Sequence, residues 1–514
     1  MRTKKALRNT LFSLGGCLLV FVFGIVVRKL FIENLDLNNL GYEGLFTNIF
    51  TLLSLSDLGM GSLLTYRLYA ALASEDAGEV RWLMSTFRRL YAVVAGGMLV
   101  VGLLLMPALP FIIKDEISDW NYVYFLYAVQ LVGYVGMYLL AYRRTLMVAD
   151  QQGFVVAKID TAFRIGSQIL KVAVLLLFQN YIVYMLVSVA SNILTNVVIG
   201  VRCKKQYGDA LRGAYEPGSL RRSGLLKEIK ASAYIQIISG VYQLTDSVLI
   251  SYLIGIRTVA AYGNYTMIGY NVQRIFQEIL KPVASTVGNY VNLEDPHDSF
   301  RLFGALNLAG YLCASFAFTA FSVLFQPVIS VLFGPSLLLP DAFVIAYSLF
   351  FYIMIKACVL SAFRGSFGRY DREKIYYTAS SLINLGLSIW LGRRIGITGI
   401  MIGTVVAEFV IWGGRYLLVC RELFHDNGLR TLCRQAGYML LAGAEMAAAW
   451  LLTSQMPVSW GGIFLRALVC LVLPNAVNLL LFFRTDAFSV LLTYVKKAVA
   501  LVKNRGAEPG EENA

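Results

Sequence analysis

Long apolar runs, separated by short polar connections, make up most of this chain. Each run has about the 20 residues that an α-helix needs to cross a hydrocarbon core roughly 30 Å thick. Soluble folds have no use for such runs, so the pattern predicts an all-α polytopic membrane protein with about 14 transmembrane helices. The predicted spans are residues 10–32, 42–66, 90–113, 121–142, 154–178, 181–201, 231–254, 258–280, 303–333, 339–363, 375–392, 399–420, 435–453 and 460–483.

The composition agrees with this pattern. Hydrophobic residues make up 58% of the chain and charged residues only 15%, well below the roughly 25% of soluble domains. The seven cysteines are scattered without paired spacing, so the sequence predicts no disulfide and no zinc site. His297 and His425 both lie in connections and are too few for a metal centre.

Lysine and arginine fall almost entirely on one side of the predicted spans. With the N-terminus placed in the cytoplasm, 33 of the 45 basic residues lie in cytoplasmic connections. The opposite side holds only Lys114, Arg257, Arg393 and Arg394. The positive-inside rule therefore predicts that both termini are cytoplasmic. This topology accounts for the net charge of +14, so the basic character predicts no nucleic-acid partner.

The connections suggest a transporter more than an enzyme. Every predicted extracytoplasmic connection is short, and no Gly-x-x-x-x-Gly-Lys loop for a nucleotide is present. We therefore expect no catalytic residues and no cofactor other than a coupling ion. Residues 1–32 are charged and then apolar without a cleavage site, which predicts a first helix that is retained.

The chain repeats itself weakly at a spacing of about 220 residues. Gly44–Thr47 matches Gly263–Thr266, and Ala141–Arg143 matches Ala362–Arg364. The repeating unit holds six spans, so both copies face the same way, as in the parallel repeats of transporters. The predicted divisions are a six-helix bundle, a cytoplasmic linker, a second six-helix bundle, two further transmembrane helices, and an amphipathic helix with a disordered tail: 1–205, 206–229, 230–425, 426–484 and 485–514.

We take eight basic and six acidic residues as lying at membrane depth. Each would cost roughly 2.5–3.5 kcal/mol facing lipid, so most must face a protein interior or a water-filled cavity. Four polar residues of one span, Asp160, Arg164, Gln168 and Lys171, share one helical face. The alternative interpretation is structural: buried ion pairs such as Arg164 with Asp160, or Arg274 with Glu278.

Several short motifs resemble those of bacterial oligosaccharide flippases, the repeat-unit transporters of capsule, O-antigen and exopolysaccharide synthesis. These transporters belong to the MOP (MATE-related) exporter superfamily. The first hairpin carries Leu40-Gly41, Gly44–Asn48 and Ser54–Gly59, and the second half begins with Thr245–Ser247, Tyr262–Tyr265 and Val287–Asn289. The resemblance covers nearly the whole chain. One departure is Asp57, where relatives often have Glu.

The resemblance implies two six-helix bundles around a central cavity in the bacterial cytoplasmic membrane. It implies alternating access for an undecaprenyl-pyrophosphate-linked oligosaccharide, with membrane lipids around the protein. A polysaccharide polymerase or glycosyltransferases are candidate partners. Because a pyrophosphate needs clustered cations, the predicted substrate-binding residues are Arg28, Arg164, Lys171, Arg274 and Lys356.

Resetting an empty cationic cavity is easier if a cation binds there, which requires a carboxylate. Asp57 and Glu278 stand at equivalent positions of the repeat, and Asp246 is a third candidate that can instead neutralise Arg28. We predict Na⁺ or H⁺ coupling through one of these acids, with charge pairing inside the bundle as the alternative.

Three other functions compete with this one. A lipid II flippase for peptidoglycan would share the cationic cavity. A cation-coupled drug exporter of the MATE type should have an acid-dominated cavity, whereas basic residues outnumber acids in these spans. A membrane-bound polymerase or glycosyltransferase would need a sizeable catalytic loop, which the short outer connections do not provide.

The predicted topology can be tested by labelling single cysteines, in a cysteine-free background, with a membrane-impermeant reagent. Residues in 202–230 should escape labelling in intact cells, and residues in 334–341 should react. The reverse pattern would show that the orientation is inverted.

Overall fold

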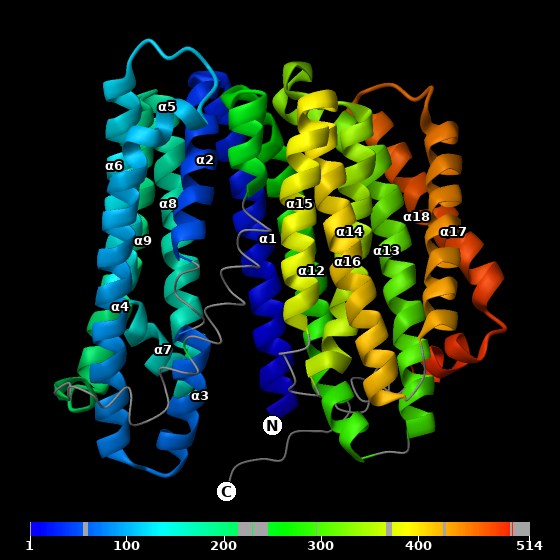
Figure 1. The fold of residues 1–514 in the computed structure, drawn as a ribbon, viewed down its shortest axis with the longest axis horizontal. Coiled ribbons are helices and arrows are strands. Elements are labelled where there is room, and N and C mark those ends of the chain that lie inside the picture. Colours follow the sequence, from blue (N-terminus) through cyan, green and yellow to red (C-terminus); the bar gives the residue numbers. More distant parts are fainter. Residues whose placement is uncertain are drawn as a thin grey trace, which may run out of the picture. The chain divides into compact units, whose positions relative to one another are not determined.

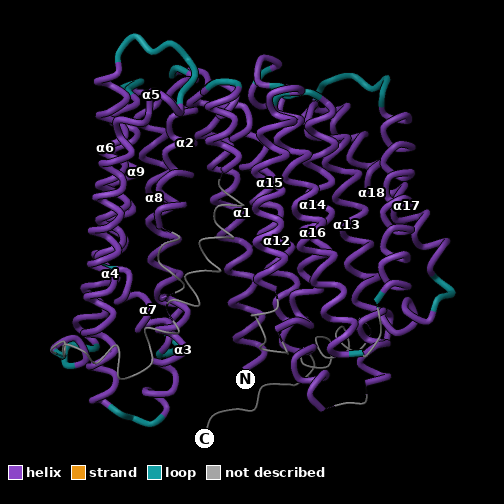
Figure 2. The backbone as a smooth tube through the Cα atoms, viewed as in Figure 1, coloured by secondary structure: helices purple, strands orange, loops and turns teal. Residues whose placement is uncertain are grey.

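The computed structural model describes residues 2–54, 60–213, 229, 245–293, 296–365, 373–424, 428–493 and 496. Within this part of the chain every regular element is helical (Figures 1 and 2). The prediction of an all-α protein is therefore confirmed. The longer helices are α1 (Arg2–Asn34), α2 (Leu37–Ser54), α3 (Met60–Ala73), α4 (Ala77–Leu105), α6 (Trp120–Leu139), α7 (Ala141–Ala149), α8 (Gly153–Leu177), α9 (Tyr181–Gln206), α12 (Ile256–Leu293), α13 (Pro296–Phe333), α14 (Asp341–Gly365), α15 (Lys374–Ile395), α16 (Ile397–Leu423), α17 (Leu429–Thr453) and α18 (Trp460–Phe482).

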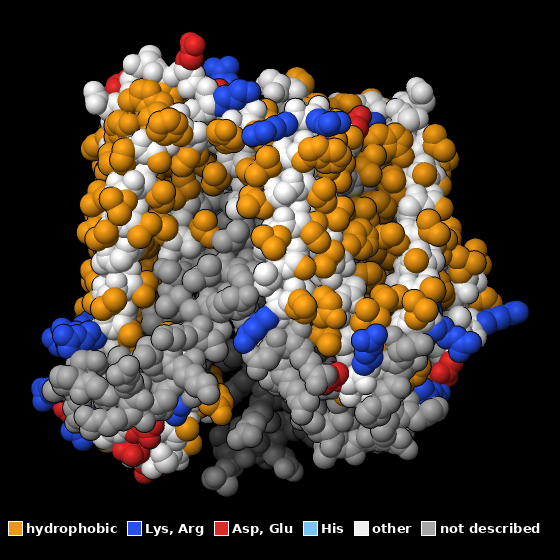
Figure 3. All heavy atoms as spheres, in the orientation of Figure 1, with side chains coloured by type: hydrophobic (Ala, Val, Ile, Leu, Met, Phe, Trp, Pro, Cys, Tyr) orange, Lys and Arg blue, Asp and Glu red, His pale blue; other side chains and the backbone are white. Residues whose placement is uncertain are grey.

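Eight helical stretches of the described chain are long and apolar enough to cross a membrane. Each coincides with a predicted span or with a span and its flanking turns. In Figure 3 hydrophobic side chains cover the middle of the helices, while lysine, arginine and acidic side chains gather toward the helix ends. This arrangement is the one that a hydrocarbon layer with polar head groups on both sides requires. The count of 14 spans stays a prediction, because part of span 231–254 lies outside the described residues.

The chain forms two compact units: residues 1–271 with 377–403, and residues 272–376 with 404–514. We call them unit 1 and unit 2. These two units differ in their bounds from the predicted division of the sequence. The division into two six-helix bundles with a linker stays a prediction.

In unit 1, α1 packs along α8, α8 along α9, α9 along α6, and α6 along α4. The helices begin where side chains supply the hydrogen-bond acceptors that the first turn lacks. Asp76 accepts from the backbone N–H groups of the first turn of α4, Asp119 does so for α6, and Asn180 does so for α9. These caps set the short connections between neighbouring helices.

Several helices extend beyond the predicted spans, and the longest extensions lie on the side that carries the basic connections. The helix α4 begins at Ala77 although its span was predicted from residue 90, and α9 continues to Gln206 although its span was predicted to end at 201. The bilayer thickness limits the apolar run but does not limit the helix, because Arg and Lys are good helix formers. The hydrophobic pattern therefore placed these spans correctly. It predicted helices that are shorter than those in the structure.

The first residues of the predicted linker 206–229 are ordered. The short helix η3 (Ala210–Arg212) packs on α4, and the Tyr207 hydroxyl donates a hydrogen bond to Asp150 at the end of α7. Burial raises the pKa of the Tyr207 phenol, and the neighbouring Asp150 carboxylate raises it further. The phenol therefore stays protonated at neutral pH and keeps its donor role.

In unit 2, α13 is the central helix, since α14, α17 and α18 all pack against it. The helices α17 and α18 also pack against each other and correspond to predicted spans 435–453 and 460–483. Ser459 caps α18 by accepting from the Gly462 N–H at 3.2 Å.

The motif residue Gly41 allows α2 to approach the start of α12. A Cβ atom at Gly41 would lie 2.3 Å from the Ile256 carbonyl oxygen and 2.8 Å from the Ile256 Cγ1. No L-residue fits that space without moving one of the two helices, which gives the glycine of this motif a packing role.

We expect Gly41→Ala to destabilise unit 1 by about 1–3 kcal/mol, the usual cost of overpacking, despite the better helix propensity of alanine. The measurement is thermal unfolding in detergent. Gly96→Ala in α4 is the matched control, because nothing lies within 4 Å of its new Cβ. Equal unfolding temperatures for the two variants would contradict the packing role of Gly41.

Candidate functional site

A cavity of about 360 Å³ lies within unit 1, between α1, α2, α8, α9 and α12. We call it the Arg28 cavity. Its lining is unusually polar for the inside of a membrane helix bundle. The polar and aromatic residues around it are Arg28, Glu43, Thr47, Asn48, Gln168, Lys171, Tyr184, Ser247, Tyr262, Thr266 and Tyr270.

Arg28 is held in place by neutral groups of α12. Its Nε donates to the Asn264 Oδ1 at 2.7 Å, and its Nη2 donates to the Ala260 carbonyl at 3.0 Å. Gly263 makes this approach possible, since a Cβ there would lie 2.8 Å from Nη2. The sequence motif at residues 262–265 therefore forms part of the binding surface for the Arg28 guanidinium. Within the described residues Arg28 forms no ion pair, and the role of Asp246 stays a prediction.

Lys171 is the second cation of the cavity, and it contacts an aromatic ring. Its ammonium lies 4.6 Å from the centre of the Tyr184 ring, a cation–π contact. It forms no ion pair in the described part of the chain. Glu43 is the one carboxylate among the residues that line the cavity, so the lining carries two positive charges against one negative charge.

Uncompensated cations are costly in a medium of low dielectric constant. A cavity that holds two of them, at fixed positions and with hydrogen-bonding neighbours, is suited to an anionic ligand. The tyrosine and amide side chains of the same wall can bind a polar, uncharged part of that ligand.

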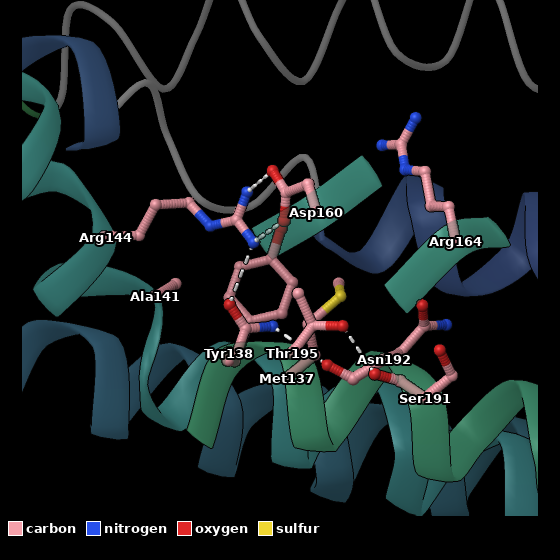
Figure 4. A pocket seen from close by; sticks show the side chains of 10 residues that line it. Met137, Tyr138, Ala141, Arg144, Asp160, Arg164, Ser191, Asn192 and Thr195 are labelled. Carbon is pink, nitrogen blue, oxygen red and sulfur yellow. Dashed lines mark hydrogen bonds and ion pairs between the residues drawn. The ribbon is translucent and has the colours of Figure 1, made fainter. Parts of the chain in front are cut away.

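Arg164 lies in a second pocket of about 310 Å³, between α6, α7, α8 and α9 (Figure 4). There Arg144 binds Asp160 with two hydrogen bonds, each of 2.7 Å, and also contacts the Asn196 amide oxygen at 3.3 Å. The guanidinium of Arg164 lies apart from Asp160, and the residue is exposed. The structural alternative of an Arg164–Asp160 pair is therefore wrong, because Arg144 on α7 presents a planar fork to the same carboxylate.

The remaining predicted cations lie in unit 2. Lys356 is only 1% exposed, and its ammonium donates to the carbonyl oxygen and the Oδ1 of Asn307 at 2.9 and 3.0 Å. The same ammonium lies 5.5 Å from the Tyr438 ring centre. Arg274 has an exposed side chain on α12. A substrate-binding role for these two residues stays a prediction.

The predicted coupling acids are only partly described. Asp246 is buried, at 5% exposed, in the helical segment 245–253. Asp57 and the side chain of Glu278 lie outside the described residues, so their roles stay predictions.

Sequence reasoning missed three residues of these sites: Glu43, Tyr184 and Arg144. Glu43 stands at the second residue of its predicted span, where a charge is expected to reach the interface. The signal that could have found it is helical spacing, because residues 43, 44, 47 and 48 all line the cavity from one face of α2. Arg144 was assigned to a basic connection, and no periodicity connects it with Asp160.

The fold of the described chain is similar to that of several solved membrane transporters. No family model and no curated protein sequence matches the chain. Solved structures do. The lipid II flippase MurJ, in an inward closed conformation, superposes with a TM-score of 0.70 at 12% identity, covering 92% of this chain and 99% of that chain.

Two further structures have the same fold. An inward-facing multidrug resistance MATE transporter of the MOP superfamily gives a TM-score of 0.60 at 14% identity, covering 79% of this chain and 94% of its own. A MOP superfamily transporter from Pyrococcus furiosus, described as having a binding pocket of reverse polarity, gives 0.56 at 12% identity, covering 81% and 95%. At these identities the likeness shows the fold, and the substrate has to be argued from the site.

The Arg144–Asp160 pair and Arg164 should differ in their effect on stability. Asp160→Asn removes charge-assisted hydrogen bonds, so we expect a loss of about 1.5–3 kcal/mol in the free energy of unfolding. Arg164→Gln, on an exposed side chain one turn away, should change it by less than about 0.5 kcal/mol. Unfolding in mixed detergent micelles measures both. A larger loss for Arg164→Gln would contradict the pairing.

Proposed function

We propose that this protein is a flippase that moves undecaprenyl-pyrophosphate-linked oligosaccharide repeat units across the cytoplasmic membrane by alternating access. The observation that carries the proposal is the Arg28 cavity, where Arg28 and Lys171 face the same space without an ion-pair partner in the described residues. An anion that enters this space supplies the missing negative charge.

A pyrophosphate fits the two cations by their chemistry. The guanidinium of Arg28 uses Nε and Nη2 for Asn264 and Ala260, which orients the plane of the group and leaves its other N–H donors available. The ammonium of Lys171 is a compact point charge that suits a second phosphate oxygen. An arginine fork and a lysine together match a diphosphate better than they match a neutral or cationic drug.

The glycan part of the substrate needs hydrogen-bonding and aromatic walls. The cavity offers the amides of Asn48 and Gln168 and the rings of Tyr184, Tyr262 and Tyr270. Sugars bind such surfaces through hydroxyl groups and through the apolar faces of their rings. The prenyl chain requires no polar site, since it can remain in the lipid.

A second candidate function is the flipping of lipid II, which also carries a pyrophosphate on a polyprenyl chain. The match to MurJ favours it, because that structure covers 92% of this chain while the multidrug MATE transporter covers 79%. Both candidates use a lipid-linked pyrophosphate and require the same cations. A drug exporter for cationic compounds is disfavoured by the excess of positive charge in the cavity.

Energy for the reaction can come from the membrane potential and from a coupling ion. Outward movement of an anionic head group is driven by an inside-negative potential and gains about 2.3 kcal/mol per charge per 100 mV. We keep Asp57, Asp246 and Glu278 as the proposed Na⁺ or H⁺ coupling acids. Cation binding at one of them would reset the emptied cavity. A polysaccharide polymerase or glycosyltransferases remain the proposed partners.

Replacement of either cavity cation should abolish transport. In proteoliposomes that contain a fluorescent lipid-linked oligosaccharide, we expect Arg28→Ala and Lys171→Ala to slow flipping by about 10- to 100-fold, the loss of one charge-assisted contact each. Arg28→Lys should also fail, because an ammonium cannot keep both Asn264 and the substrate in the guanidinium plane. Lys356→Ala tests whether the cation of unit 2 shares this role.

Lys29→Ala is the matched control, since Lys29 neighbours Arg28 on α1 but is exposed and lies 4.0 Å from Glu33. It should flip at the wild-type rate, and all variants should be present in the membrane at equal amounts. Wild-type flipping by both Arg28→Ala and Lys171→Ala would sink the proposal. A parallel assay with fluorescent lipid II decides between the two lipid-linked substrates.

A further inference from the structure

Polar side chains form a buried line along α13 in unit 2. Asn307, Tyr311, Ser315, Thr319 and Ser322 follow one another at helical spacing on one face, and each is at most 4% exposed. The faces of α14, α17 and α18 pack against this helix. Apolar side chains would satisfy such a position between helices without cost, so the polar line calls for a physical explanation.

Next to the middle of this line lies a buried carboxylate of another helix. It is Glu445 of α17, which is 3% exposed. The Ser315 hydroxyl donates a hydrogen bond to its Oε2. The Asn478 amide of α18 donates in turn to the Ser315 Oγ at 3.4 Å. Three helices therefore meet at one carboxyl group through side-chain hydrogen bonds, and we call these residues the Glu445 cluster.

Two oxygen atoms of the Glu445 cluster have no hydrogen-bond donor. Glu445 Oε1 and Asn478 Oδ1 are both sealed from solvent and both unpartnered in the described structure. Both are acceptors when the carboxyl group is ionised, so neither can satisfy the other. The Tyr311 hydroxyl, which is also unpartnered, can serve one of them, and a proton on the carboxyl group can serve the other.

The charge balance points the same way. Within the described residues Glu445 has no ion-pair partner, and a buried carboxylate is stable as an anion only with a cation or several donors nearby. The titratable groups that face it are the phenols of Tyr311 on α13 and Tyr352 on α14, which carry no positive charge. Two cations of unit 2 have other partners: Lys356 donates to Asn307 two turns along α13, and Arg466 donates to the Met456 carbonyl.

We infer that Glu445 is a proton-binding site in unit 2, and that its proton latches the α17–α18 hairpin to α13. With a proton on Oε1 the carboxyl group is neutral and becomes a donor as well as an acceptor. The buried negative charge is then removed, and the carboxyl group can donate to a neighbouring acceptor. Release of the proton leaves an unpaired anion between three helices, which weakens their packing. The inference is independent of the substrate that the Arg28 cavity carries.

The proton itself can be seen by infrared spectroscopy of the protein in lipid vesicles. We expect wild-type protein at neutral pH to show the C=O stretch of a buried carboxylic acid, shifted downward in D₂O and absent from Glu445→Gln. Glu79→Gln, an exposed acid of α4, is the control that should leave the band unchanged. A wild-type spectrum without the band, or a band that survives Glu445→Gln, would overturn the inference.

The latch can be followed by Cys470 of α18, a buried thiol at 1% exposed whose Sγ lies 4.0 Å from the Thr319 carbonyl. Mass spectrometry measures its alkylation in wild type and in Glu445→Gln at each alkaline pH. Dividing the two rates removes the titration of the thiol itself. The ratio should rise by about tenfold per pH unit while the protonated form still dominates. A ratio independent of pH would contradict the latch.

The wild-type protein alone keeps the test decisive if Glu445→Gln does not fold. Loss of the acid band and gain of Cys470 reactivity should then occur over the same pH range. If instead Na⁺ removes the band at constant neutral pH, the cluster is a sodium site and the proton inference is wrong.

Discussion

A hydrocarbon medium cannot solvate charges or unpaired hydrogen-bonding groups, and this constraint governs the whole molecule. It makes every regular element of the described chain helical, because only a helix satisfies its N–H and C=O groups within one segment. It also sorts the polar side chains. Each one must be paired, must reach an interface, or must face a space where a ligand or water completes its hydrogen bonds.

The described charges fall into these categories. Arg144 and Asp160 are paired through a bidentate contact, and the Lys356 ammonium donates to two neutral oxygens of Asn307. Such groups hold helices together. Arg28 and Lys171 are different, because both face one cavity whose lining carries two positive charges against the single negative charge of Glu43. The difference between paired and unpaired cations is what separates scaffold from site in unit 1.

The motif glycines connect this electrostatic arrangement to the packing. Gly263 leaves room for the Arg28 guanidinium against the α12 backbone, and Gly41 lets α2 approach Ile256 at the start of the same helix. A side chain at either position would push apart the helices that surround the cavity. The resemblance to oligosaccharide flippases rests partly on these residues, so its motifs have a physical role here: they build the space in which the cations lie.

The sequence alone determined the membrane class, the helical content and the place of most spans, because a 20-residue apolar run has one stable solution in a bilayer. It also identified Arg28 and Lys171 as costly charges that require an explanation. It could not show that these two line one cavity with Glu43 and Tyr184, nor that Asp160 binds Arg144 and not Arg164. Those outcomes depend on which faces of separate helices meet. Helical periodicity reports the face of a residue on its own helix, whereas the neighbour of that face is decided only when the helices pack.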